Sequence, residues 1–566
     1  MPSLAVEKNQ LIKEIGKQVT DEELNDIVFD FGVELDEIYQ ENGKSMAKFD
    51  IPANRYDLLC LEGFSTALRA YMDVEKFKDL NIKDTVGATV YRKNTHEREF
   101  ISCAIIRGIN FDKNKYESFI GYQDKLHCSI GRNRSLLAIG THDFSKINGK
   151  ITYQTTNLSD IQFTPLNCEM KESNEHKNLK LISGSELKNY FSNDKKISKF
   201  FDLLSSSEKS VVFKCDDTVM SVPPIINSND TKISMDTKDI FIEVTGSDFN
   251  KVNTALKYIL YNFKGESIEY VEIINEDTTE KIRTPQFNNF NFKISLETVN
   301  KKLHLSLTIE EAKRLLEKML YKVSIESNSL NVYVYDVRAD VLHECDIIED
   351  IAIAYGFNNF TFRCPPIYTV GFENPINKFS DKVRQELAIF GFIEVLTLTL
   401  LSKSENIISS DKAVVLGNPK SKEYEVVRTS LLPGILKSIS SNLHTKIPIK
   451  VFEVADVVLL DEKMDEGAKN ERRACCVIAA NRSLLEDVQG PLSMLFTKCG
   501  ITDFSYEKSN DPRYLENQNA NVKIGDIVIG TLGVLHPHIC QQFEVPYAAS
   551  SFEINLELLF NYFMNK

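Results

Sequence analysis

Four carboxylates stand close together between Arg338 and Gly356, and their spacing could serve a metal ion. They are Asp340, Asp346, Glu349 and Asp350. The last three are spaced i, i+3 and i+4, so a helix over about residues 346–355 would bring them to neighbouring positions of its first turns, and Asp340 could close the cluster from the preceding loop. An all-oxygen cluster with few protein ligands suits Mg²⁺. The alternative is that acidic residues at a helix N-terminus only complement the helix dipole.

The elements that would hold this cluster follow from capping and periodicity. Capping boxes at Thr20 to Glu23 and Thr308 to Glu311 predict the starts of two helices. Alternating residues over 331–337 predict a strand just before the carboxylate helix. Other segments with strand character lie at 100–107, 240–245, 393–401, 449–460 and 473–480. Together these segments predict an α+β fold.

The length of 566 residues is enough for about three to five domains with separate cores. We place the predicted domains at 1–90, 91–275, 283–365 and 370–566. The first is a small α/β unit, and the second is rich in strands. The third ends in the carboxylate helix, and the fourth follows as a helix and a sheet.

The composition is that of an ordinary soluble globular protein, with 42% hydrophobic and 26% charged residues. No apolar run reaches the roughly 18 residues of a membrane span, and the sequence shows no signal peptide, so a cytoplasmic protein is expected. The net charge of −14 argues against the chain as a whole acting as a nucleic-acid-binding surface. Its 11 scattered cysteines lack a Cys-x-x-Cys pair and favour neither zinc nor disulfides.

Several sequence blocks resemble one protein family. Besides the carboxylate segment, they are Asp50 to Gly63, Ile139 to Asp143, Val222 to Asn227, Arg428 to Gly434 and Gly533 to Pro537. Their types and order are similar to those of the β subunit of cytosolic phenylalanine-tRNA ligases of eukaryotes and archaea. The resemblance runs from near residue 1 to near residue 560, and the blocks together make it specific.

The resemblance implies a multidomain α+β fold. After the N-terminal α/β unit it implies an editing-type α+β domain, a winged-helix-like domain and a C-terminal antiparallel-sheet domain like that of class II synthetases. Active class II enzymes hold ATP with two arginines. Arg428 stands near the first position, but the segment Gly530 to Pro537 offers no arginine for the second. We therefore expect a catalytically silent domain with no residue for synthesis, in which Arg428 is structural or interfacial.

The resemblance places chemistry in the editing-type domain. A pocket for phenylalanine rejects tyrosine by only about 10², because the wrong substrate merely adds a hydroxyl. A second, hydrolytic site must then accept the phenol and position a water. The candidates are Ser221, Asn227, Glu243, Thr245 and His142, with Arg132 and Arg134 upstream. Ser221 and Asn227 flank the Pro223-Pro224 turn, and Glu243 and Thr245 share one strand face. The alternative for each is a structural role in a turn or hydrogen bond.

As a whole, the resemblance implies the β subunit of a phenylalanine-tRNA ligase, an ATP-dependent enzyme with Mg²⁺ as cofactor. Its partners would be an α subunit that carries synthesis, in an (αβ)₂ heterotetramer, and tRNA(Phe), with no membrane. The helix and strand over 379–401 are the expected α contact, because their apolar face needs a partner. Two alternatives stay open: a non-catalytic synthetase-like scaffold, and a free-standing hydrolase of mischarged tRNA.

Overall fold

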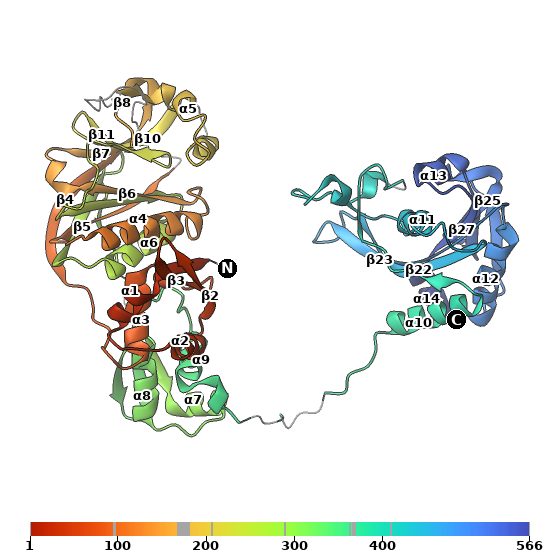
Figure 1. Cartoon of the computed structure of the whole chain (residues 1–566), viewed down its shortest axis with the longest axis horizontal. Coiled ribbons are helices and arrows are strands. Elements are labelled where there is room, and N and C mark those ends of the chain that lie inside the picture. The colour runs from red at the N-terminus through yellow and green to blue at the C-terminus, as the bar shows by residue number, and fades with distance from the viewer. Residues whose placement is uncertain are drawn as a thin grey trace. The chain divides into compact units, whose positions relative to one another are not determined.

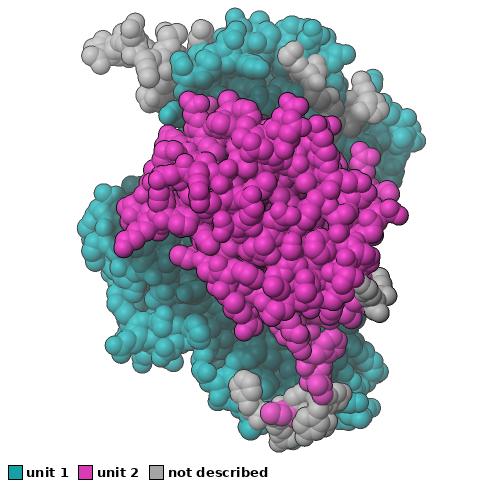
Figure 2. All heavy atoms as spheres, turned by 90° about the vertical axis from the view of Figure 1, so that its right-hand side faces the viewer, with its two compact units in different colours: residues 1–363 teal, residues 364–566 magenta. Residues whose placement is uncertain are grey.

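The computed structural model describes residues 2–93, 95, 98–166, 181–204, 208–287, 290–361, 364, 369–407 and 410–564. The chain forms two compact units, unit 1 over residues 1–363 and unit 2 over residues 364–566, which Figure 2 colours separately. Each unit has buried apolar clusters of its own. Among the helices of the described residues, none is long and apolar enough to cross a membrane.

Unit 1 begins with a three-stranded antiparallel sheet in the order β1-β3-β2. The elements of this part are β1 (Ser3–Glu7), α1 (Lys8–Ile15), α2 (Asp21–Asp30), β2 (Glu34–Glu41), β3 (Lys44–Asp50) and α3 (Leu61–Tyr71). Thr20 and Glu23 form the predicted capping box, and the prediction is confirmed. Leu24 and Val28 are buried one helical turn apart, so α2 packs its apolar face into the core.

The largest sheet of unit 1 has ten strands in the order β12-β11-β10-β7-β4-β14-β5-β13-β6, with β15 paired to β14. They are β4 (Ile82–Lys93), β5 (Phe100–Arg107), β6 (Leu137–Asp143), β7 (Ile151–Asn157), β10 (Lys209–Cys215), β11 (Thr218–Val222), β12 (Ile226–Asn227), β13 (Ile240–Gly246), β14 (Ser267–Asn275) and β15 (Lys281–Thr284). Helices α4 (Lys113–Cys128) and α6 (Phe249–Asn262) lie on one face (Figure 1). The short elements β8 (Gln162–Phe163), β9 (Ile182–Ser183) and α5 (Leu187–Tyr190) lie at the end of the sheet formed by β10 and β11 (Figure 1).

Two predicted domain boundaries fall inside strands of this sheet. Residue 90 lies within β4, which pairs with β14 and β7. Residue 283 lies within β15, which pairs with β14. Strand pairing is a long-range property, so the pattern around each boundary did not reveal it.

The third part of unit 1 is a small sheet with three helices. The sheet order is β16-β18-β17, and all pairs are antiparallel. The elements are β16 (Phe290–Ser295), α7 (Leu296–Leu303), α8 (Ile309–Lys318), β17 (Tyr321–Glu326), β18 (Ser329–Val334) and α9 (Glu344–Tyr355). The capping box of Thr308 and Glu311 is confirmed. Helix α9 begins two residues before the predicted start and ends at Tyr355 as predicted.

Unit 2 is built on a seven-stranded sheet in the order β19-β22-β23-β27-β26-β25-β24. The strands are β19 (Ile393–Glu394), β22 (Ile449–Leu460), β23 (Ala468–Ala480), β24 (Phe504–Lys508), β25 (Tyr514–Ile524), β26 (Ile527–Leu535) and β27 (Ala548–Asn555). One core cluster holds α10 (Pro375–Ile389), α12 (Leu485–Lys498) and α14 (Leu556–Met564), and another holds α11 (Leu432–Ser440) and α13 (Pro537–Gln542). The two helix groups lie on opposite faces of the sheet (Figure 1).

The predicted long strand over 393–401 is wrong in extent. The structure has two short strands there, β19 and β20 (Leu400–Leu401), and β20 pairs with β21 (Val426–Val427) in a separate two-stranded sheet. Between them, the Val395 N–H donates to the Phe452 carbonyl at 2.8 Å and the Thr397 hydroxyl donates to Glu453 Oε2 at 2.6 Å, both on β22. The pairing of β20 with β21 is a long-range feature that the local strand pattern did not show.

Candidate functional site

Glu243 is the centre of the candidate editing site. It lies on β13 between β5 and β6, and only 1% of its surface is exposed. Gly140 on β6 is its direct partner. A Cβ atom at residue 140 would lie 2.2 Å from Glu243 Oε1. Glycine at 140 therefore makes room for a carboxylate inside the sheet, which is a common reason for glycine within a strand.

The polar contacts of Glu243 leave one carboxylate oxygen unused. Ser221 on β11 donates its hydroxyl to Oε1 at 2.5 Å. His142 Nε2 lies 3.6 Å from the same oxygen, and Nδ1 of this histidine lies 2.8 Å from Thr231 Oγ1. Within the described part of the chain, Glu243 Oε2 and His142 Nε2 are buried and make no hydrogen bond. A buried carboxylate oxygen without a donor is costly, so Oε2 is ready to accept a hydrogen bond from a ligand.

A small pocket of about 10 Å³ lies beside Glu243, which is room for about one water molecule. Its walls are Arg134, Ala138, Ile139, Pro223, Pro224, Ile226, Asn227 and Glu243. Asn227 pairs with Ser221 across β11 and β12, so the Pro223-Pro224 turn brings both next to the glutamate. The structure thus gathers Ser221, His142 and Glu243 in one cluster and places Asn227 in the pocket wall.

Thr245 lies apart from the pocket wall. It shares a strand face with Glu243, as predicted from their spacing, but is fully buried. Its Oγ1 accepts a hydrogen bond from Arg98 Nε at 3.4 Å, and its carbonyl accepts one from Arg98 Nη2 at 3.0 Å. Burial lowers the pKa of Arg98. Thr245 therefore anchors an arginine next to the site.

Arg134 fixes the loop that forms the opposite wall. Its Nη1 donates to the carbonyls of Pro224 and Ile225, both at 3.1 Å, and its guanidinium lies 4.4 Å from the ring centroid of Phe200. Sequence reasoning named Arg134 only as an upstream neighbour and missed Gly140 and Arg98. For Gly140 a signal existed, because a glycine inside a predicted strand indicates a close approach. Arg98 gives no such signal, since its partner is distant in sequence.

The predicted Mg²⁺ cluster does not converge on a common point. Arg338 donates to both oxygens of Asp340, at 2.9 and 2.8 Å, and to Asp350 Oδ2 at 2.7 Å. The Tyr321 hydroxyl donates to the same Asp350 oxygen at 2.5 Å. Although burial opposes ionisation, Arg338 holds the pKa of Asp340 below its ordinary value. A buried guanidinium thus supplies the positive charge that the sequence analysis assigned to Mg²⁺.

The other two carboxylates face elsewhere. Asp346 Oδ2 accepts the backbone N–H groups of Leu342 and His343 at 2.8 and 2.9 Å, so it caps α9. Glu349 is exposed on the same helix. In the described ranges, no three or more His, Cys, Asp or Glu side chains are grouped to hold a metal ion. The arrangement therefore does not fit an ion held by Asp340, Asp346, Glu349 and Asp350 together, and Asp346 follows the alternative helix-terminus interpretation.

In unit 2, Arg428 is held by protein groups. Its Nη1 donates to Glu453 Oε1 and to Thr397 Oγ1, both at 2.9 Å, and its Nε donates to the Asp456 carbonyl at 3.0 Å. Arg428 and Glu453 are 5% and 1% exposed. Their charges balance inside the protein, as expected for a structural arginine.

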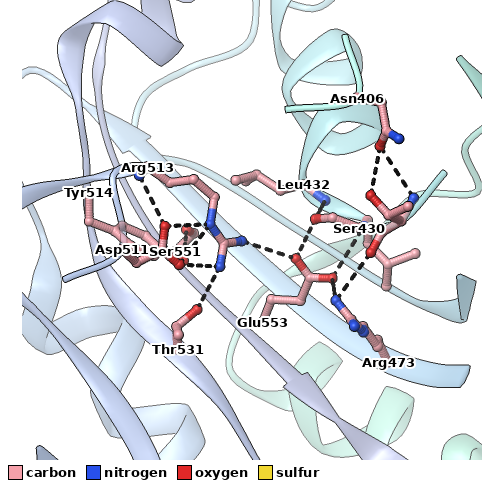
Figure 3. A network of polar contacts seen from close by, with 12 residues as sticks. Asn406, Ser430, Leu432, Arg473, Asp511, Arg513, Tyr514, Thr531, Ser551 and Glu553 are labelled. Carbon is pink, nitrogen blue, oxygen red and sulfur yellow. Dashed lines mark hydrogen bonds and ion pairs between the residues drawn. The ribbon is translucent and has the colours of Figure 1, made fainter. Parts of the chain in front are cut away.

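A second ionic network fills the centre of the same sheet. Glu553 on β27 accepts hydrogen bonds from Ser430 at 2.5 Å and from Arg473 at 3.2 Å, and Arg513 Nη1 lies 3.7 Å from its Oε2. Figure 3 shows the two arginines reaching Glu553 from opposite sides. Arg513 is also paired with Asp511. Arg473 begins the segment predicted as a strand at 473–480, but sequence reasoning gave neither arginine a role, and both are already paired with carboxylates.

Comparisons with known proteins agree with this architecture. Four family profiles match: the Phe-tRNA synthetase beta subunit B1 domain at residues 1–74, the B3/4 domain at 109–272, the tRNA synthetase B5 domain at 292–357, and the phenylalanyl tRNA synthetase beta chain CLM domain at 363–556. The candidate editing site lies in the B3/4 range.

Relatives match over the whole length. The chain is 48% identical to a probable phenylalanine–tRNA ligase beta subunit of Encephalitozoon cuniculi, with 100% of both chains covered. It is 35% identical to the phenylalanine–tRNA ligase beta subunit of Mus musculus, covering 98% of this chain and 100% of the relative. A crystal structure of an N-terminal fragment of the phenylalanyl-tRNA synthetase beta subunit from Pyrococcus horikoshii is 31% identical with a TM-score of 0.56, covering 62% of this chain and 99% of the fragment. The chain belongs to the phenylalanine–tRNA ligase beta subunit family of aminoacyl-tRNA ligases.

Proposed function

We propose that this chain is the cytoplasmic β subunit of a phenylalanine-tRNA ligase and that its own chemistry is hydrolytic editing of tyrosyl-tRNA(Phe). Synthesis from ATP and phenylalanine is assigned to an α subunit, in an (αβ)₂ assembly that binds tRNA(Phe). The observation that carries the editing proposal is the buried, unpartnered Oε2 of Glu243 beside a pocket.

The chemistry follows from that oxygen. The pocket must widen from about 10 Å³ to admit a tyrosyl side chain. The phenol of that side chain then donates to Glu243 Oε2, whereas a phenylalanyl side chain leaves this acceptor buried and unpaired. A site that hydrogen-bonds a substrate hydroxyl discriminates strongly against the analogue that lacks it. Ser221 holds Glu243 through its hydrogen bond to Oε1, and Asn227 in the pocket wall orients the ester and the attacking water. No Ser-His-Asp arrangement is gathered among the described residues of this site, so hydrolysis rests on positioning.

The test is hydrolysis of tyrosyl-tRNA(Phe) by the Gly140→Ala variant. The added Cβ would lie 2.2 Å from Glu243 Oε1 and must displace the carboxylate. We expect a loss of about tenfold to a hundredfold, as for a displaced catalytic geometry. The control is Gly121→Ala on α4, where nothing lies within 4 Å of the new Cβ. Equal rates for Gly140→Ala and wild type would contradict the assignment.

The contacts of the arginines in unit 2 support the proposal that this chain does not carry out synthesis. Arg428, Arg473 and Arg513 are all engaged by protein carboxylates, so a triphosphate would have to break existing ion pairs to bind there. The isolated chain should therefore show no phenylalanine-dependent exchange of pyrophosphate into ATP. Exchange should appear on addition of the α subunit, and exchange by this chain alone would overturn the proposal.

The α contact is proposed at the edge of the unit 2 sheet. β19 is the edge strand, and the nearby apolar side chains are Ile389, Ile393, Leu396 and Leu398, which are 69%, 63%, 85% and 67% exposed. Exposed apolar groups of this density indicate an interaction surface. Phe379, at the start of the expected contact, is 8% exposed and belongs to the core of unit 2. The contact is therefore narrower than the range 379–401.

For Mg²⁺, we propose only Glu349 as a protein ligand, because Arg338 engages Asp340 and Asp350 and Asp346 caps α9. Mg²⁺ commonly uses one or two carboxylates and keeps several waters. Equilibrium dialysis with Mg²⁺ should show weaker binding for Glu349→Gln, and unchanged binding for Glu310→Gln, an exposed control on α8. Equal binding by wild type and Glu349→Gln would refute the assignment.

Two experiments separate the alternatives. Isolation without any second synthetase chain, together with hydrolysis of tyrosyl-tRNA, would indicate a free-standing hydrolase. Isolation with a partner but without hydrolysis would indicate a scaffold.

A further inference from the structure

A cavity of about 410 Å³ lies in unit 1, apart from the editing pocket. It is bounded by α3, by the segment 75–81 and by the end of α6 with the start of β14. Its walls include Glu62, Arg69, Phe77, Tyr261, Lys264 and Ser267. Its volume is in the range of small-molecule sites.

Two buried hydrogen-bond donors in its walls are unused. Ser267 is 3% exposed, and its hydroxyl has no hydrogen-bond partner among the residues that the structure describes. Over the same residues, the buried Arg69 Nε makes no hydrogen bond, although it lies 3.5 Å from Glu75 Oε2. Buried polar groups without a partner are rare in folded proteins, so each indicates a missing acceptor.

A half-buried cation lies in the same cavity. Lys264 Nζ donates to the Lys78 carbonyl at 2.8 Å and lies 4.9 Å from the ring centroid of Phe77. Burial lowers the pKa of Lys264. An anion in the cavity would stabilise this charge where water cannot.

Three of the acidic groups in the walls already have partners. Glu75 accepts from Lys78 at 2.6 Å, and Asp79 accepts from the Tyr261 hydroxyl at 3.2 Å. Glu62 accepts from the Ser118 hydroxyl at 2.6 Å. The fourth acidic wall residue, Glu14, is exposed to solvent. Within the described residues, the buried wall groups that lack a hydrogen bond are the donors of Ser267 and Arg69, which are complementary to an oxyanion.

We propose that this cavity binds a small organic oxyanion, a carboxylate or a phosphate. Ser267, Arg69 and Lys264 donate to its oxygens, and the rings of Phe77 and Tyr261 contact its apolar part. The site is independent of the editing pocket, because it shares no wall residue with it.

The test is calorimetric titration of the intact protein with two probes, inorganic phosphate and benzoate. Ser267→Ala and Lys264→Met should each lower the affinity for the probe about tenfold, because each removes a donor to an anion. The matched control is Ser65→Ala. Ser65 lines the same cavity, but its hydroxyl already donates to the Glu62 carbonyl at 3.3 Å, so binding should change by less than about twofold.

The two probes distinguish the sources of the anion. Binding of phosphate alone assigns a phosphate ligand, and binding of benzoate alone assigns a carboxylate; binding of both assigns a general oxyanion site. Ser267→Ala should unfold at the wild-type temperature, because it removes only an unpaired hydroxyl. Absence of binding by either probe at millimolar concentration overturns the proposal. So does equal binding by wild type and Ser267→Ala.

Discussion

Two buried glutamates, one in each unit, occupy similar places in a β-sheet and differ in how fully they are bonded. Glu553 receives hydrogen bonds from Ser430 and Arg473, and further positive charge from Arg513. Glu243 receives one from Ser221, and its Oε2 has none from the described residues. A carboxylate that the protein satisfies completely holds the fold together, whereas one left open can accept a bond from a substrate.

The largest effect is expected from neutralising Glu553, whose carboxylate is hydrogen-bonded by the protein. Glu553→Gln leaves Arg473 and Arg513 without their shared anion, and breaking a buried ion pair from one side costs about 3–5 kcal/mol. The free energy of unfolding of unit 2, measured by denaturant titration, should fall by about that amount.

The control for this change is Glu507→Gln, because Glu507 pairs with Lys523 at the surface and is 58% exposed. It should cost less than about 1 kcal/mol. If Glu553→Gln is as mild as the control, the network in unit 2 is not structural, and the contrast between the two glutamates disappears.

The next effect concerns Asp340 and Asp350 near α9, whose carboxylates accept hydrogen bonds from Arg338. Arg338→Gln removes the cation that serves Asp340 and Asp350, so unit 1 should lose about 3 kcal/mol of unfolding free energy. Arg314→Gln, which breaks an exposed pair with Asp73, should change stability by less than about 1 kcal/mol. If Arg338→Gln lost as little unfolding free energy as Arg314→Gln, a group other than Arg338 would have to balance the charge of these carboxylates.

A smaller effect is expected from acid. The pKa of Asp340 lies below its ordinary value, so the unfolded chain binds this proton more tightly than the folded protein. The stability from the Asp340–Arg338 pair is therefore present above about pH 4 and is lost as the pH falls through the folded pKa. Asp340→Asn should be less stable at neutral pH and lose less stability on acidification than wild type. Asp84→Asn, at a 91% exposed position, should follow the wild-type curve.

Local signals in the sequence predicted local structure well. The capping boxes at Thr20 and Thr308 are where they were predicted, and β22 has the predicted bounds 449–460. These features depend on neighbours in sequence and on periodicity. The predicted strand over 393–401 is wrong in extent because its two ends pair with different partners, β19 with β22 and β20 with β21, and such long-range pairing leaves no local signal.

The residues of the candidate sites also differ in whether a local pattern could place them. Ser221 on β11, Asn227 on β12 and Glu243 on β13 lie close together. The spacing related Ser221 to Asn227 across the Pro223-Pro224 turn, whereas only the family resemblance related them to Glu243. The Mg²⁺ hypothesis placed four carboxylates by helical spacing but did not consider that Arg338, two residues before Asp340, could fold back on them. Arg513 reaches Glu553 from a distant segment, so no local pattern could place it.

The sharpest experiment replaces Glu243 or Glu553 with glutamine in two separate variants. For each variant, it measures hydrolysis of tyrosyl-tRNA(Phe) and the free energy of unfolding. We predict that Glu243→Gln lowers hydrolysis of tyrosyl-tRNA(Phe) about a hundredfold, because it removes a charged acceptor for the phenol. Its free energy of unfolding should change by less than about 1 kcal/mol. Glu553→Gln should do the opposite, with reduced stability of unit 2 and hydrolysis at the wild-type rate under native conditions. Hydrolysis by Glu243→Gln at the wild-type rate would show that Glu243 does not bind the phenol in the editing reaction.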